Sequence, residues 1–85
     1  AYPNPFNPIT TISFTIHEES EVELIMYNIK GQKINNLIKQ VLIKGDHSIS
    51  WDGRNNNGEE VSSGLYLCRL RIEDQIISKK LMMMK

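Results

Sequence analysis

Apolar and polar residues alternate along most of the chain with a period of two. In residues 11–16 and 66–72, apolar side chains are separated by single polar ones in almost every step. This period is typical of a β-strand with one buried face. Both faces of residues 22–27 carry apolar side chains, so we expect that strand to lie centrally in its sheet. Five stretches complete the set of candidate strands: 22–27, 32–38, 41–43, 47–51 and 76–84.

Asparagine, aspartate and glycine residues separate these strands and indicate turns. The turns are expected at residues 28–31, 44–46, 52–58 and 73–75. Short strands with turn signals about every eight to twelve residues are typical of an immunoglobulin-like sandwich. A competing helix over residues 29–42 is disfavoured, because this segment contains β-branched side chains and two adjacent asparagines. The pattern therefore predicts an all-β fold, an immunoglobulin-like antiparallel β-sandwich of about seven strands.

The start of the chain differs from the rest, because it holds all three prolines of the sequence: Pro3, Pro5 and Pro8. Each proline fixes φ, lacks a backbone N–H and pushes the preceding residue towards extended geometry. We therefore expect residues 1–9 to form a stiff, proline-rich arm, anchored by Phe6. Residues 10–85 are expected to form the sandwich, so that residues 1–85 make a single domain.

Composition argues against several classes of function. The 85 residues carry ten basic and ten acidic side chains, and zero net charge gives no electrostatic footprint for nucleic acid or an anionic membrane. The longest apolar run, residues 81–84, is too short to insert into a bilayer. The single cysteine, Cys68, cannot form an internal disulfide and is expected to be a buried, inert thiol. The chain starts without Met or a signal peptide, so we expect it to be an excised or processed piece of a longer chain.

Catalytic and metal-binding patterns are weak. His17 and His47 each stand alone, without a patterned nucleophile or an orienting carboxylate. Residues 52–59 invite comparison with a calcium loop, but Arg54 occupies what would be the second ligand position, and the spacing to Glu59 is wrong. An asparagine-rich hairpin is the favoured interpretation. We therefore expect a protein that is not an enzyme and that needs no cofactor or metal.

Several motifs together carry a family resemblance. The chain opens with Tyr2-Pro3-Asn4-Pro5-Phe6-Asn7-Pro8, and this run with residues 9–14 looks like the start of a type IX secretion C-terminal sorting domain, type A. Matching segments follow in the order of that family: Val22-Glu23-Leu24 through Gln32, Trp51-Asp52-Gly53-Arg54 through Gly58, Ser63-Gly64-Leu65-Tyr66, and Lys80-Leu81 with Lys85. The Trp-Asp-Gly and Gly-x-Tyr parts also resemble flagellar hook-cap immunoglobulin-like domains, in which a proline-rich opening is not expected.

The resemblance implies a non-catalytic sorting signal at the C-terminus of a larger exported protein. Such domains direct their cargo through the periplasm and the type IX secretion system to the cell surface or the medium. The implied partners are the outer-membrane translocon, a sortase-like cysteine peptidase that commonly removes the domain, and the N-terminal cargo domain of the parent chain. The domain itself is expected to be a monomer that neither binds nucleic acid nor inserts into a membrane.

Candidate residues for translocon recognition lie in three places along the chain: Pro3, Asn4, Pro5, Phe6, Asn7 and Pro8; Gly64 and Tyr66; and Lys80, Leu81 and Lys85. Each group also has a structural interpretation. The arm can serve as a clip for the sandwich, while a glycine in a turn and a buried tyrosine bonded to backbone are common in such folds. Lysines on a last strand commonly protect a sheet edge, although an edge strand can also add to a partner sheet.

Two other functions stay open from the sequence. One is a structural assembly module whose sheet edges pack against neighbouring subunits. The other is a carbohydrate-binding module of a secreted protein, which needs two or three exposed, coplanar aromatic side chains. The chain has six aromatic residues, and most stand at positions with a core pattern.

Overall fold

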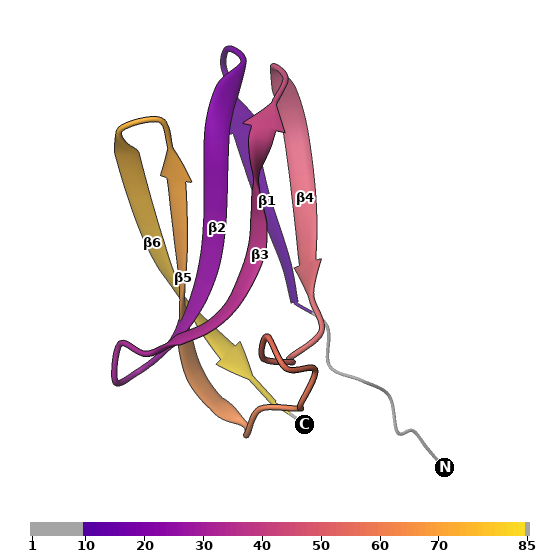
Figure 1. Cartoon of the computed structure of the whole chain (residues 1–85), viewed down its shortest axis with the longest axis vertical. Coiled ribbons are helices and arrows are strands. Elements are labelled where there is room, and N and C mark those ends of the chain that lie inside the picture. Colours follow the sequence, from indigo (N-terminus) through magenta and orange to yellow (C-terminus); the bar gives the residue numbers. More distant parts are fainter. Residues whose placement is uncertain (1–9, 85) are drawn as a thin grey trace.

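The chain folds into antiparallel strands, as Figure 1 shows for the computed structural model, which describes residues 10–84. Six strands and no helix occur in this range, and no membrane-spanning helix is found there. The strands are β1 (Thr10–Ile16), β2 (Ser20–Asn28), β3 (Lys33–Leu42), β4 (Gly45–Trp51), β5 (Gly64–Ile72) and β6 (Gln75–Met83). The predicted all-β, immunoglobulin-like sandwich is therefore confirmed, with six strands instead of about seven.

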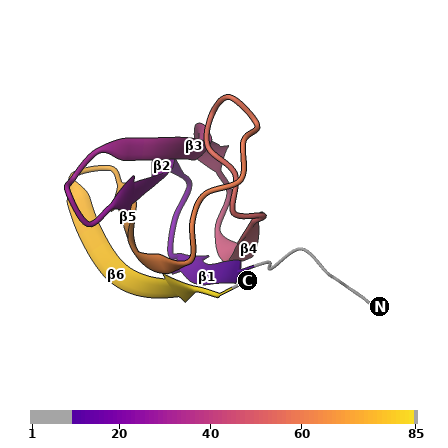
Figure 2. The same cartoon turned by 90° about the horizontal axis from the view of Figure 1, so that it is seen from below.

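Two sheets face each other across the core (Figure 2). The larger sheet has the order β3-β2-β5-β6, and the smaller one pairs β1 with β4. The central position predicted for residues 22–27 is confirmed, because β2 lies between β3 and β5, and Ile25 on its outer face is only 3% exposed. Burial of the inward side chains drives the folding of such a sandwich. They are Ile12, Ile16, Val22, Leu24, Met26, Leu42, Trp51, Tyr66, Cys68, Leu70 and Met83.

The structure has one strand fewer than expected, because the two strands predicted at residues 32–38 and 41–43 are the single strand β3. Residues 39 and 40 continue the ladder by pairing with Glu23 and Val22. Two register shifts interrupt the β2–β3 pairing further along. Each shift sets an extra residue of β3 against β2, which reverses the face of the following side chains. These bulges disturb the alternation within residues 33–38, whereas the expected break between the two strands falls at Lys39 and Gln40, which are both exposed in the continuous strand.

Candidate recognition site

Two motifs that are separate in the sequence lie side by side in the larger sheet. The Gly64-Leu65-Tyr66 motif begins β5, and Lys80-Leu81 lies near the end of β6. The antiparallel register places Gly64 opposite Met83, Leu65 opposite Met82, Tyr66 opposite Leu81, and Leu67 opposite Lys80. Two of the three candidate recognition groups thus meet at the lower end of the sandwich in Figure 1.

The inward side of this ladder is structural. Tyr66 is 7% exposed, and its hydroxyl donates a hydrogen bond to the backbone carbonyl of Ser62 at 2.7 Å. Its ring meets Trp51 edge to face, with the centroids 5.3 Å apart. The Trp51 indole N–H donates to the carbonyl of Arg54 at 2.9 Å. The buried rings therefore hold the start of β5 against the core, which is the tyrosine-corner arrangement of immunoglobulin-like sandwiches.

Gly64 sets the direction of the chain at this point. Its φ of 153° is positive, and no atom lies within 4 Å of the position that a Cβ would take. A larger residue would have room here, but its backbone would be strained. Leu65 and Tyr66 follow in β5 and point to opposite faces of the sheet, as successive strand residues do.

The outward side of the ladder is exposed and apolar. Leu65 is 38% exposed, its cross-strand neighbour Met82 is 60% exposed, and Met84 just beyond β6 is 72% exposed. Lys80 is also exposed, one position along the same face. We call Leu65, Lys80, Met82 and Met84 the C-terminal patch. Exposed apolar side chains gathered next to a charge mark interaction surfaces more often than isolated ones do.

Only Lys80 of this patch was among the sequence candidates. Leu81, by contrast, is half-buried and packs against the core, and Gly64 and Tyr66 act from beneath the patch. Leu65 and Met82 were not among the candidates, because the family resemblance rests on the glycine, tyrosine, lysine and leucine residues beside them. The alternation of side chains could have indicated them, because each stands next to an inward-facing residue of its strand and must therefore face outward.

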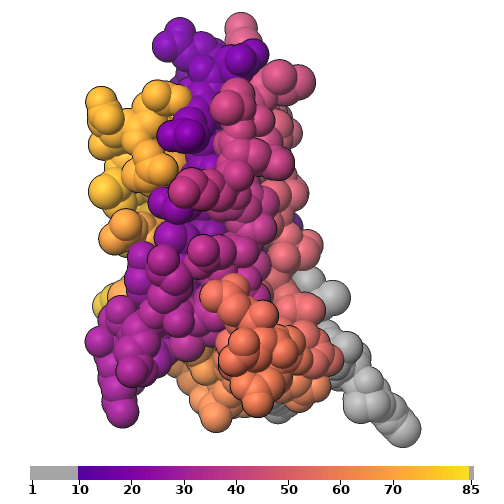
Figure 3. All heavy atoms as spheres, in the orientation of Figure 1, coloured from indigo at the N-terminus to yellow at the C-terminus, as the bar shows by residue number. Residues whose placement is uncertain are grey.

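The polar run 52–63 is a loop that covers one edge of β3 and forms the orange mass at the lower end in Figure 3. The Asn56 backbone N–H donates to the carbonyl of Ile34 at 3.0 Å, and the Asn36 N–H donates to the Asn56 side chain at 3.1 Å. The Asn55 side chain accepts bonds from two backbone N–H groups within the loop. The asparagines thus satisfy backbone groups, and residues 10–84 contain no cluster of three or more possible His, Cys, Asp or Glu metal ligands.

The reactive side chains have structural partners. A ring nitrogen of His47 lies 2.8 Å from the carbonyl of Ile43, and the ring stacks on Phe14 with the centroids 5.8 Å apart. Cys68 is 2% exposed, and burial raises the pKa of its thiol from 9.0 to about 11, against the opposing effect of Lys79. The expected burial of Cys68 is confirmed, and the raised pKa keeps it protonated near neutral pH.

We expect Cys68 to react slowly with iodoacetamide. At pH 8, a shift of the pKa from 9.0 to about 11 lowers the thiolate fraction about a hundredfold relative to the unfolded chain. The native rate should also rise about tenfold per pH unit between pH 8 and 10, because the thiolate fraction does so. Mass spectrometry of the folded and the urea-unfolded chain measures both rates. Equal rates in the two states would contradict the burial of the thiol.

The remaining sequence candidates lie outside the described residues. These are Pro3, Asn4, Pro5, Phe6, Asn7, Pro8 and Lys85, and their roles stay predictions. In the described part, β1 begins and β6 ends at the same lower end of the sandwich (Figure 1). Both ends of the described chain therefore lie at the end of the molecule that carries the C-terminal patch.

Comparison with known proteins identifies the family. The family model described as "Secretion system C-terminal sorting domain" matches residues 1–84. The chain belongs to this family. Members of the C-terminal sorting domain family act as C-terminal signals for type IX secretion, and the role of the chain is to target a larger cargo chain for export to the cell surface or the extracellular space. The family is not known to be catalytic.

The fold of this sorting domain is shared with a solved structure, FlgD from P. aeruginosa. The TM-score is 0.69 at 20% sequence identity, and the match covers 88% of this chain but only 60% of the FlgD chain. The likeness shows the fold, and it agrees with the predicted relation to flagellar hook-cap immunoglobulin-like domains. A search of the curated proteins found no match to the sorting domain.

Proposed function

We propose that the type IX translocon recognises the folded sandwich through the C-terminal patch. The observation that carries this proposal is the β5–β6 register, which brings Leu65 of the Gly-x-Tyr motif next to Met82 and Lys80 of the C-terminal motif. A receptor surface that covers the patch removes three apolar side chains from water and pairs with one cation. Methionine is well suited to such a contact, because its flexible and polarisable side chain adapts to a partner.

The buried members of the two motifs position this patch. Tyr66 and Leu81 pack inward at opposite positions of the ladder, and Met83 is 1% exposed. Their burial keeps β5 and β6 in one register, so that Leu65 and Met82 stay adjacent. The proline-rich arm, residues 3–8, is proposed as a second contact on the strength of its sequence alone.

The wider set of partners follows from the family role. The cargo would precede the domain in the parent chain, and a sortase-like cysteine peptidase would remove the domain after export. The domain would act as a monomer during this process. Sedimentation of the 85-residue chain over a range of concentrations tests the last point, since an assembly module would form oligomers that increase with concentration.

The described aromatic side chains do not favour the carbohydrate-binding alternative. Trp51 and Tyr66 are buried in the core, Phe14 is half-buried against His47, and Tyr27 lies beneath the guanidinium of Arg69, 5.5 Å from its ring centroid. Among residues 10–84, no exposed pair of rings is available as a platform for a sugar. A pull-down with insoluble polysaccharide checks this alternative directly.

Export of a reporter tests the proposed function. A periplasm-directed fluorescent protein that carries residues 1–85 at its C-terminus would be expressed in a type IX-competent bacterium and in a matched translocon-deficient strain. We expect fluorescence on the surface or in the medium only in the competent strain. Retention in both strains, while an endogenous type IX cargo is still exported by the competent one, would contradict the proposal.

A further inference from the structure

An open groove lies between β1 and the β5–β6 hairpin. Its lower part is a hollow of about 230 Å³, and its upper part is a hollow of about 530 Å³ that opens at the end of the sandwich. The two parts are continuous, because Thr15, Ile72 and Ile77 line both of them. We call this opening the β1–β6 groove.

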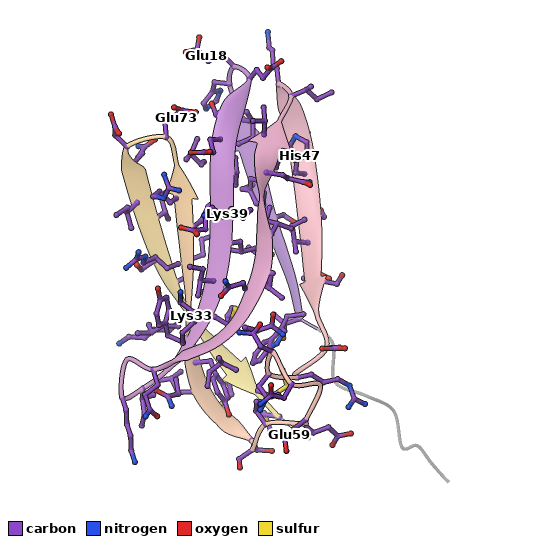
Figure 4. The ribbon with its side chains drawn as sticks, in the orientation of Figure 1. Glu18, Lys33, Lys39, His47, Glu59 and Glu73 are labelled. Carbon is purple, nitrogen blue, oxygen red and sulfur yellow. The ribbon has the colours of Figure 1, made fainter. Side chains whose placement is uncertain are left out.

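The groove has apolar walls and charged ends. Ile12 and Phe14 of β1 face Leu70, Ile72 and Ile77 of the hairpin across the lower hollow. Lys79 lines the lower hollow as well, on the inward face of β6 opposite Cys68. Acidic side chains line the upper hollow, and Figure 4 labels two of them, Glu18 and Glu73, at the upper end. The groove therefore runs from a cation to an acidic rim over an apolar floor.

One side of the groove is a free strand edge. β6 is the last strand of its sheet and pairs with β5 alone among the described strands. The two-residue turn at Glu73 and Asp74 makes Ile72 and Gln75 a hydrogen-bonded pair, so alternate residues of β6 from Ile76 onward direct their backbone groups away from β5. Ile76 is 55% exposed and Ile77 is 40% exposed. Such an edge can accept a further strand.

The charges on β6 restrict which strand can add. Neither Lys79 nor Lys80 makes a salt bridge within residues 10–84, whereas Arg54 and Arg71 each lie within 4.0 Å of two carboxylates. A second copy fits poorly, because full antiparallel pairing of two β6 strands sets Lys79 against Lys79, and like charges directly opposite are destabilising. Residues 1–9 fit poorly as well, since their three prolines lack the N–H groups that a ladder needs.

We propose that the β1–β6 groove receives an extended strand of the export machinery that pairs with the free edge of β6, places apolar side chains in the groove and sets acidic residues opposite Lys79 and Lys80. This inference rests on the proposed sorting function and names a further contact for it, which shares Lys80 with the C-terminal patch but otherwise uses other residues. The added strand would contact Ile77 and Lys79 with its inward side chains and Lys80 with an outward one, because successive residues alternate between the two faces.

The test uses two blocked peptides of ten residues. In both, valine alternates with threonine, and the probe has two adjacent glutamates at its centre where the control has two lysines. Because the two charged residues stand at the centre of the peptide, they can lie opposite Lys79 and Lys80 whether the peptide runs parallel or antiparallel to β6. Backbone amide shifts of the 85-residue chain, followed by ¹H–¹⁵N NMR, locate the binding and give both affinities. We expect shifts along β6 and β1, and on the order of tenfold tighter binding of the glutamate peptide.

A charge reversal sharpens this test. The double variant Lys79→Glu and Lys80→Glu should prefer the lysine peptide, and its amide spectrum shows directly that it is folded. Equal affinity of the wild-type chain for the two peptides, or shifts outside β6 and β1, would overturn the proposal. Dimers of the wild-type chain formed through β6 would also overturn it, because they would assign the edge to a second copy.

Export assays separate this inference from the sorting function. The wild-type reporter should be exported in the competent strain, and the single variant Lys79→Glu, which leaves every residue of the C-terminal patch unchanged, should be exported at least about tenfold less. Equal export of the two would overturn the role of the groove while leaving the sorting function intact. Failure of the wild-type reporter would instead count against the sorting function, whatever the peptides show.

Discussion

Replacing Trp51 with alanine should lower the free energy of unfolding by about 3–5 kcal/mol. The side chain is 1% exposed, belongs to the hydrophobic core between the two sheets, and contacts the ring of Tyr66 edge to face. Its removal leaves a large cavity, which the surrounding strands can close only in part. A domain of this size has about 5–15 kcal/mol in total, so the variant would be close to unfolding. Urea denaturation followed by circular dichroism measures the change.

Two further variants define the origin of this loss. Ser50→Ala changes the preceding, exposed residue and should leave stability within about 0.5 kcal/mol. Trp51→Phe keeps a ring in the core and removes the indole N–H. The carbonyl of Arg54 then still accepts a hydrogen bond from the Asn35 side chain at 2.7 Å, so the variant should be much more stable than the alanine variant. A loss below about 1 kcal/mol for Trp51→Ala would contradict its place in the core.

The alternation of side chains predicted most of this fold because it reports burial directly. β1, β4 and β5 each keep a period of two, and the inward residues of β1 and β5 are those that the pattern selected, whereas β6 is exposed over most of its length. β3 was predicted as two strands because Lys39 and Gln40 interrupt its apolar residues, and only the pairing with β2, which is distant in the sequence, shows that the strand continues through them. The count of strands therefore depended on tertiary contacts that a local pattern does not contain.

The recognition site, too, depends on contacts between strands that a local sequence pattern does not contain. Sequence motifs indicated Gly64, Tyr66, Lys80 and Leu81, but they could not tell that the two motifs are opposed in one ladder. Once the register is known, the exposed face consists of Leu65, Lys80, Met82 and Met84, and the other motif residues support it from inside. The β1–β6 groove was also beyond the sequence, because it is formed by strands from opposite ends of the chain.

Introducing aspartates at Leu65 and Met82 should reduce export of the reporter at least about tenfold, while the domain stays folded. Both side chains are exposed, so the native fold can hold the carboxylates in water. A receptor that buries the C-terminal patch would have to desolvate two charges that replace apolar contacts. Export is measured as surface and medium fluorescence, and circular dichroism with urea denaturation shows that folding is unaffected.

This double variant separates recognition from folding better than a truncation does. Deleting residues 80–85 should also abolish export, but it removes Leu81 and Met83 from the core and thereby disrupts the sheet as well. The matched control is Val41→Asp with Ile43→Asp, since these side chains are 58% and 68% exposed and lie near the β3–β4 connection at the opposite end. Export of this control should equal that of the wild type. If the control loses export as well, general apolar exposure and not the C-terminal patch carries the signal. If both variants are exported normally, the translocon reads another surface, and the β1–β6 groove becomes the leading one.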